Sequence, residues 1–336
     1  MNGDIPMNDK PTVLAIIGPT ASGKSALAVA LAKELGGEII SCDSMQIYRG
    51  MDVGTAKPTK EEMQGIKHHL IDFVEPTSAF SCSDFATLAR AAANDVISRG
   101  GLPILCGGTG LYLDAFIRGN LPSPDADKGA DPGYRAHLEA VAAEQGTAVL
   151  HEMLKEVDPV SAESIHPNNQ KRIIRALEVY HNTGIPKSEH DRRSKDFECP
   201  YNVLIIGLRF EDRERLYRRI EKRVDQMLDA GLVDEVRALE AMQIFETSPT
   251  ASQAIGYKEL LAYVRGLTDL DTCTEELKKA TRRYAKRQMT WFTRYDNIHW
   301  ITVDGVDTDS NNALTFEDIV NIAKKLYADL ISCDII

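Results

Sequence analysis

Short apolar runs alternate with helix-like spacing in the first part of the chain. Thr12 to Ile17 is an apolar, β-branched run typical of a buried strand, and Ala26 to Leu35 has the composition of a helix. Glu38 to Ser41 and Pro103 to Cys106 predict two more strands, while apolar residues three or four apart predict a helix over Ser81 to Arg99. This alternation of strands and helices indicates a parallel sheet covered by helices.

The pattern changes near residue 119, where helices and proline-rich connections replace the strands up to about residue 200. Strand pattern returns at Asn202 to Leu208 and at Ile298 to Val303. Helices are expected from about Asp212 to Gly231, Thr274 to Arg294 and Phe316 to Leu330, the second starting with the capping-box pattern Thr272-x-x-Glu275. We therefore expect a catalytic core formed by residues 1–118 and 201–336, and a helical insertion domain at residues 119–200.

One motif connects the first predicted strand to the first predicted helix. It matches G-x-x-x-x-G-K-[ST] and consists of Gly18, Pro19, Thr20, Ala21, Ser22, Gly23, Lys24 and Ser25. In such a loop the backbone N–H groups and the helix N-terminus point at a bound phosphate. Lys24 adds a positive charge, and the Ser25 hydroxyl can ligate Mg²⁺. The expected fold is thus α/β, a P-loop NTPase-like parallel sheet flanked by helices, with an all-helical insertion domain.

The motif leaves the phosphate compound open. Many such loops serve ATP or GTP, so a small-molecule or nucleoside kinase is one interpretation, with Asp43 acting on the phosphate acceptor. The strand that ends at Cys106 continues into Gly107-Gly108-Thr109 and has no aspartate to hold Mg²⁺ there, which weakens that interpretation. A nucleotide-regulated RNA-binding switch is a further alternative.

Composition and charge narrow the picture. The formal net charge of −11 favours a small anionic or neutral substrate, so any nucleic-acid contact would have to use local basic faces. No run approaches the ~18 apolar residues of a membrane helix, and the polar N-terminus has no secretory pattern. The cysteines lack C-x-x-C spacing, which argues against a zinc site or a disulfide framework and favours a reducing compartment. We expect a cytoplasmic monomer without membrane association.

Several segments together resemble the tRNA dimethylallyltransferase (tRNA isopentenyltransferase) family. The phosphate-binding motif alone is widespread, but the block D-S-x-x-I-Y-x-x-M-D-x-G-T-A-K-P is highly specific. The resemblance covers about residues 13 to 303, and without a C-terminal zinc finger the chain looks like the bacterial form. The segments are the phosphate-binding motif, Ser41 to Pro58, His68 to Asp72, Gly107 to Tyr112, His166 to Asn168, Arg172, Arg175 to Glu178, Gly256-Tyr257 and Lys286 to Trp291.

The resemblance implies a reaction and roles for individual residues. Dimethylallyl diphosphate and Mg²⁺ would bind at the phosphate loop, and N6 of the adenine beside the tRNA anticodon, position 37, would be alkylated with release of diphosphate. Asp43 would be the general base, because N6 is a poor nucleophile and must lose a proton as the new bond forms. Lys24, Ser25 and Arg223 would hold the diphosphate, and Thr109 would lie near the reacting centre.

The same resemblance places tRNA contacts in three segments, with the helical insertion closing over the tRNA. The adenine must leave its stack to reach Asp43. A basic helix near residues 279–294 is a further candidate, although surface helices often carry such charges. The expected tRNA-binding residues are Asp43, Ser44, Met45, Gln46, Lys171, Arg172, Ile173, Ile174, Arg175, Gln253, Ala254, Ile255, Gly256, Tyr257 and Lys258.

Structural roles compete with several of these assignments. Asp43 could be a structural aspartate that caps the next helix, and Thr109 could be the N-cap of a helix beginning at Gly110. Arg215, Arg219 and Arg223 lie four apart on one helix face, where cations frequently pair with acidic side chains in solvent. We expect that solvated role for Arg215 and Arg219 and a diphosphate contact for Arg223.

Overall fold

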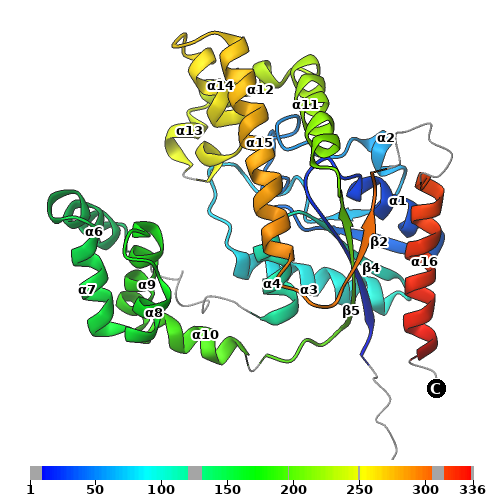
Figure 1. The fold of residues 1–336 in the computed structure, drawn as a ribbon, viewed down its shortest axis with the longest axis horizontal. Helices are drawn as coiled ribbons and strands as arrows, with labels where there is room; N and C mark the ends of the chain where they lie inside the picture. Colours follow the sequence, from blue (N-terminus) through cyan, green and yellow to red (C-terminus); the bar gives the residue numbers. More distant parts are fainter. Residues whose placement is uncertain (1–9, 120–130, 196, 249, 305–313, 334–336) are drawn as a thin grey trace, which may run out of the picture. The chain divides into compact units, whose positions relative to one another are not determined.

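The computed structural model describes residues 10–119, 131–195, 197–248, 250–304 and 314–333. The chain forms two compact units (Figure 1). The sheet unit comprises Met1–Phe80, Leu88–Leu113 and Pro200–Ile336, and the helical unit comprises Ser81–Thr87 and Asp114–Cys199. The domain boundaries expected from the sequence, near residues 119 and 200, stay a prediction.

Six parallel strands form the sheet, in the order β3-β2-β4-β1-β5-β6. The central strand β1 pairs with β4 through Leu14 and Ile104 and with β5 through Val13 and Val203. Its residues are apolar without alternation because helices cover both faces of a parallel sheet. The strands are β1 (Thr12–Ile17), β2 (Gly37–Ser41), β3 (His68–His69), β4 (Leu102–Gly107), β5 (Asn202–Arg209) and β6 (Ile298–Thr302). This α/β sheet confirms the expected fold class.

Helices of the sheet unit pack in two groups, each with its own apolar core. The first core joins β1 and β4 to α1 and α16, which lie side by side (Figure 1), through residues such as Leu27 and Ile319. The second core surrounds Tyr48 and Tyr257 and is built from α11 to α15. The helices are α1 (Lys24–Leu35), α2 (Lys60–Met63), α11 (Arg213–Asp229), α12 (Leu232–Ala241), α13 (Ile244–Thr247), η1 (Ala251–Gln253), α14 (Tyr257–Val264), α15 (Leu270–Phe292) and α16 (Phe316–Cys333). The helices α3 (Cys82–Ser98) and α4 (Gly110–Arg118) contribute residues to both units.

The start of α15 differs from the expected one. The carboxylate of Asp269 accepts a hydrogen bond from the Thr272 N–H at 2.8 Å and is the N-cap, so the helix begins at Leu270. The capping box expected at Thr272 is therefore wrong. An aspartate is as good an N-cap as threonine, and here it lies three residues closer to the preceding helix.

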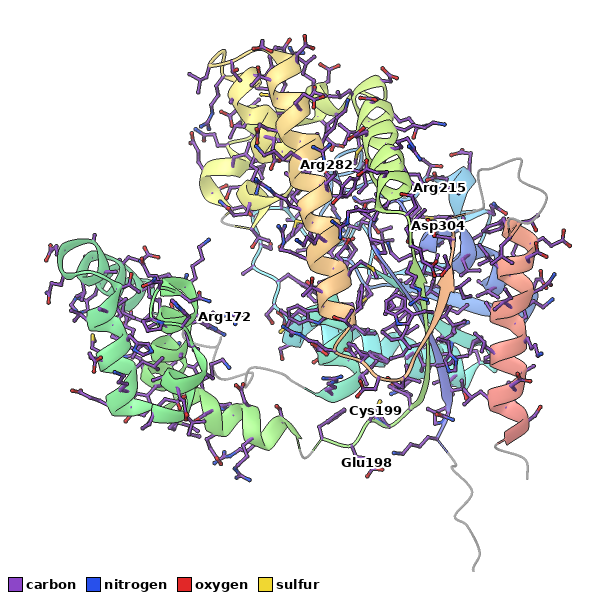
Figure 2. All side chains as sticks on the ribbon, viewed as in Figure 1. Arg172, Glu198, Cys199, Arg215, Arg282 and Asp304 are labelled. Atoms are coloured by element: carbon purple, nitrogen blue, oxygen red, sulfur yellow. The ribbon has the colours of Figure 1, made fainter. Side chains whose placement is uncertain are left out.

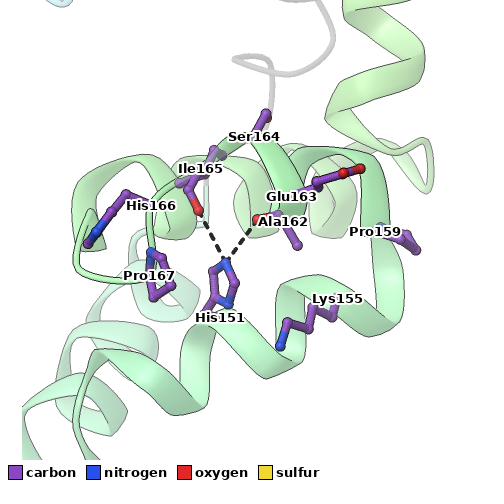
Figure 3. A pocket seen from close by; sticks show the side chains of 9 residues that line it. All are labelled: His151, Lys155, Pro159, Ala162, Glu163, Ser164, Ile165, His166 and Pro167. Carbon is purple, nitrogen blue, oxygen red and sulfur yellow. Dashed lines mark hydrogen bonds between the residues drawn. The ribbon is translucent and has the colours of Figure 1, made fainter.

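Helices joined by short turns make up the described part of the helical unit between residues 131 and 195. They are α6 (Pro132–Gln145), α7 (Thr147–Val157), α8 (Pro159–Ser164), α9 (Gln170–Thr183) and α10 (Lys187–Lys195). Their core contains Leu138, Leu150, Leu154 and Leu177. A groove lies along α7 and α8, where Nε2 of the buried His151 faces the carbonyl oxygens of Ala162 at 2.9 Å and Ile165 at 3.2 Å (Figure 3). This histidine therefore bridges backbone carbonyls of the α8 turn.

A helix that crosses a membrane must be both long and apolar. None of the helices in the described ranges meets both conditions.

Candidate active site

The loop between β1 and α1 is tightly curled. Gly18 has φ +147, and a Cβ atom there would lie 2.6 Å from the carbonyl oxygen of Leu208. Ala21 (φ 63) and Gly23 (φ 92) adopt the left-handed region, which turns successive N–H groups toward one concave side and creates an anion-binding nest. The Ser22 hydroxyl is buried and has no hydrogen-bond partner among the described residues. These features fit a loop that binds an anion.

Lys24 lies inside this loop, where its Nζ donates a hydrogen bond to the Pro19 carbonyl oxygen at 2.8 Å. Burial lowers the pKa of Lys24 to about 8, and the nearby charge of Arg223 acts in the same direction. Cys106 and Asp43 oppose this shift. A buried cation with a lowered pKa gains more than an exposed one from an anionic ligand, because the ligand restores a charge partner.

Three arginines of α11 have different environments. Arg215 turns toward Asp304 and donates to its carbonyl oxygen (Figure 2), with the Asp212 carboxylate 3.4 Å from its Nε. Nε of Arg219 donates to the Ala21 carbonyl oxygen at 2.8 Å, so this side chain supports the phosphate loop from α11. Burial lowers the pKa of Arg223, and Asp43 is the first of the charges that oppose the shift. Arg223 thus lies near the predicted base.

Asp43 follows β2 and lies beside the ends of β4 and β1. Its Oδ1 accepts hydrogen bonds from the N–H groups of Met45 at 2.9 Å and Gln46 at 3.4 Å, so it closes the turn that follows. Its Oδ2 takes part in neither bond. The expected role as a cap of the next helix is wrong, because α2 is capped by Thr59 and Asp43 closes a turn instead. The turn uses only one oxygen of the carboxylate, so it is compatible with the catalytic assignment.

Thr109 brings the end of β4 to the same turn. Its Oγ1 accepts a hydrogen bond from the Ser44 N–H at 3.1 Å, and its own N–H donates to the Cys42 carbonyl oxygen at 3.2 Å. Gly107 permits this approach, because a Cβ there would lie 2.0 Å from that same carbonyl oxygen. The carboxyl ends of β1, β2 and β4 thus gather Lys24, Asp43 and Thr109, at the edge where parallel α/β sheets bind ligands.

The metal question centres on Ser25. Its side chain hydrogen bonds toward Cys106, a thiol whose pKa burial raises to about 11. Within the described ranges, no cluster of three or more His, Cys, Asp or Glu side chains could hold a metal ion. The Ser25 hydroxyl as a single protein donor fits Mg²⁺, which usually takes one or two protein oxygens and completes its coordination shell with phosphate oxygens and water.

The residues expected to bind tRNA lie in both units. Ser44 to Gln46 form the turn after Asp43, and Gln253 to Lys258 run from η1 into α14, where Gln253 and Lys258 are exposed. Lys171 to Arg175 lie on α9 of the helical unit; Lys171 and Arg172 are exposed, whereas Ile173 and Ile174 are in the core. The contact of these segments with tRNA stays a prediction.

Gln288 is a site residue that the sequence did not single out, although it belongs to the Lys286 to Trp291 motif. It lies on α15 and is 5% exposed. Its Oε1 accepts from the Thr20 N–H at 2.8 Å, and its Nε2 donates to the Gly108 carbonyl oxygen at 3.0 Å. Tyr284, one turn earlier, has a pKa raised by burial and by the charge of Asp43. Helix α15 is thus one wall of the candidate site.

A carboxylate on α12 organises the chain beyond Asp43. Glu235 accepts hydrogen bonds from the N–H groups of Asp52, Val53 and Gly54 at 2.9, 2.8 and 2.9 Å, and from the Tyr257 hydroxyl at 2.7 Å. Gly54 packs so closely on Tyr257 that a Cβ atom would lie 2.5 Å from the ring. Glu235 therefore ties the segment that begins at Asp43 to the start of α14.

The buried ammonium of Lys57 also stabilises the segment that begins at Asp43. It contacts the carboxylates of Asp52 and Asp72 and donates to the Tyr48 carbonyl oxygen at 2.7 Å, while its side chain is only 8% exposed. No periodicity could reveal these partners, because all of them lie in irregular segments.

Comparison with known proteins gave consistent matches. The family model described as IPP transferase matches residues 46–295. A tRNA dimethylallyltransferase of Acetivibrio thermocellus is 52% identical over 297 residues, which cover 88% of this chain and 93% of that protein. The tRNA dimethylallyltransferase of Geobacillus thermodenitrificans is also 52% identical, over 86% of this chain and 89% of its own length.

Solved structures agree with these sequence matches. The full-length tRNA isopentenylpyrophosphate transferase of Bacillus halodurans has 43% identity and a TM-score of 0.69, covering 97% of this chain and 98% of that one. A eukaryotic dimethylallyltransferase acting on tRNA has 28% identity and a TM-score of 0.78, covering 95% of this chain and 80% of that one.

Proposed function

This chain belongs to the IPP transferase family, and we propose that it transfers a dimethylallyl group from dimethylallyl diphosphate to N6 of adenine 37 in tRNA, with release of diphosphate. The observation that carries this function is the meeting of an anion-binding loop with the Asp43 carboxylate at one edge of the sheet. The loop suits the leaving diphosphate, and the carboxylate suits the attacking amine.

Asp43 is the general base. As N6 forms its bond to the allylic carbon, the C–O bond of the donor breaks and its electron pair leaves with the diphosphate. The proton of N6 passes to the Asp43 carboxylate, whose Oδ2 is outside the turn that Oδ1 closes. The carboxylate is thus fixed through one oxygen and available through the other.

The leaving group gains negative charge as the bond breaks. Lys24, Arg223 and the N–H groups of the phosphate loop other than that of Thr20, which bonds Gln288, would donate to that charge, and Thr109 stands beside the base. Ser25 would hold Mg²⁺ together with the diphosphate oxygens, and the ion supplies further charge neutralisation when bound.

The proposed tRNA contacts come from three segments of the chain, of which Lys171, Arg172, Gln253 and Lys258 are exposed. Residues 43–46, 171–175 and 253–258 contact the anticodon region, and the adenine leaves its stack to enter the site. On an acidic chain these contacts are local, and the protein acts as a cytoplasmic monomer.

The experiment uses unmodified tRNA, Mg²⁺ and dimethylallyl diphosphate, without ATP, followed by mass analysis of the tRNA nucleosides. The expected product is an adenosine heavier by one dimethylallyl group. Asp43→Ala should lose this product by several orders of magnitude while keeping tRNA affinity. ATP turnover with a small acceptor and an unmodified tRNA would instead identify a P-loop kinase and overturn the proposal.

A further inference from the structure

We propose that Gln288 is a positioning residue of the transferase, which sets the spacing between the phosphate loop and the turn that carries Thr109. The inference rests on the proposed function and adds a residue that acts through others. Its basis is the pair of buried hydrogen bonds that one side-chain amide makes to two separate backbone segments.

The two bonds join parts of the chain that lie far apart in the sequence. Oε1 accepts from the Thr20 N–H, 268 positions away in the sequence, and Nε2 donates to the Gly108 carbonyl oxygen, 180 positions away. Both bonds have good lengths, and the amide is buried, so water does not compete freely for either end. One side chain therefore holds both sides of the candidate site.

The amide can have only one orientation. A backbone N–H needs the oxygen and a backbone carbonyl needs the nitrogen, so a flipped amide would lose both bonds. Gly108 leaves just enough room, since a Cβ atom there would lie 2.0 Å from Nε2. The hydrogen bond therefore requires both the amide of Gln288 and the absence of a side chain at Gly108.

The contact leads directly to the reacting groups. Thr20 belongs to the loop that would hold the leaving diphosphate, and Gly108 precedes Thr109, whose Oγ1 holds the turn after Asp43. Attack on the allylic carbon requires the amine, the carbon and the leaving oxygen to be aligned. A misplacement of about 1 Å can lower the rate by about 100-fold, so the spacing of these two segments matters for the chemical step more than for binding.

The test compares Gln288→Met, which keeps the shape, with Gln288→Glu, which keeps the acceptor for Thr20 but opposes the Gly108 carbonyl with a second oxygen. We expect both to lower kcat by about 10- to 100-fold, while the donor KM and the tRNA Kd change by less than about 3-fold. Gln226→Met, an exposed glutamine on α11, is the matched control and should leave both constants unchanged.

A double-mutant cycle with Gly108→Ala distinguishes positioning from general damage. Because the new methyl group displaces the same amide, Gly108→Ala and Gln288→Met should be strongly non-additive in kcat. Additive losses, or an unchanged kcat in Gln288→Met, would overturn the inference. If the wild-type chain makes no prenylated tRNA, the proposed function itself fails.

A measurement on the wild-type chain keeps the inference testable even if the variants do not fold. The Thr20 amide should exchange its hydrogen slowly, as expected for an N–H bonded to a buried acceptor. Fast exchange of Thr20 in the folded protein would contradict the contact.

Discussion

Replacing Glu235 by alanine should destabilise the sheet unit far more than replacing the neighbouring acid on the same helix. Glu235 accepts hydrogen bonds from the N–H groups of residues 52–54 and from Tyr257, whereas Asp234 forms an exposed ion pair with Arg237 at 2.9 Å. The two acids are adjacent on α12, so their difference isolates what each carboxylate touches.

The size of the effect follows from the partners that Glu235 leaves behind. Hydrogen bonds to a charged group contribute about 1.5–3 kcal/mol each, but bonds to one acceptor are not additive. Asp52 is exposed and its N–H can turn to water, whereas Tyr257 is fully buried and its hydroxyl would be left without this acceptor. We expect Glu235→Ala to lower the free energy of unfolding by about 3 kcal/mol. Asp234→Ala should cost less than about 1 kcal/mol.

Urea unfolding followed by far-ultraviolet circular dichroism measures both variants. Tyr257→Phe removes one of the four bonds and should cost about 1 kcal/mol. Combined with Glu235→Ala it should add little, since the hydroxyl has already lost its acceptor. The pKa of Tyr257 is raised by burial and by Glu235, so the hydroxyl stays protonated and donates throughout the neutral range.

Equal stability of Glu235→Ala and Asp234→Ala would refute this reasoning. So would full additivity of the Glu235 and Tyr257 substitutions, because the bond between them would then contribute nothing.

Three further outcomes are expected. The affinity for diphosphate should fall as pH rises through about 8, because Lys24 (pKa about 8 without ligand) is protonated below that pH and neutral above it. The measurement is the inhibition constant of diphosphate as a function of pH. Lys24→Arg should not show this loss of affinity, since arginine stays charged. Lys57→Met should lower the free energy of unfolding by roughly 1–3 kcal/mol, because the Tyr48 carbonyl oxygen and the Asp52 and Asp72 carboxylates lose their buried donor. An unchanged urea midpoint contradicts it. In the helical unit, Glu178→Gln should weaken the paired bonds to Arg135 at 2.7 and 2.6 Å and speed hydrogen exchange in α9, whereas Glu152→Gln, at an exposed pair, should not.

Local pattern was sufficient for most of the sheet. The apolar run at residues 12–17 and the returning run at residues 202–208 coincide with β1 and β5, because strands buried on both faces are uniformly apolar. The phosphate loop could also be predicted from the sequence, since its residues are consecutive and form a single motif. The two-residue edge strand β3 is too short to show any periodicity.

Residues 232–264 show where the pattern failed. The short helices α12, α13 and α14 were not expected there, because their apolar residues face a core shared with the distant Tyr48. Gln288 and Glu235 escaped notice for a related reason. Apart from the Tyr257 hydroxyl, their hydrogen-bond partners are backbone groups remote in the chain, and the side-chain sequence does not show where a backbone N–H or carbonyl group will lie.

The order of strands in the sheet has a consequence for biosynthesis. β1 leaves the ribosome early, but one of its two edges pairs only with β5. Thr12 therefore cannot form its pair until Asn202 has been synthesised. At roughly 5–20 residues per second, on the order of ten seconds or more separates their synthesis. During that interval the innermost strand of the finished protein is an open apolar edge, the kind of template that attracts other nascent chains. The strand most deeply protected at the end is thus the one exposed longest at the beginning.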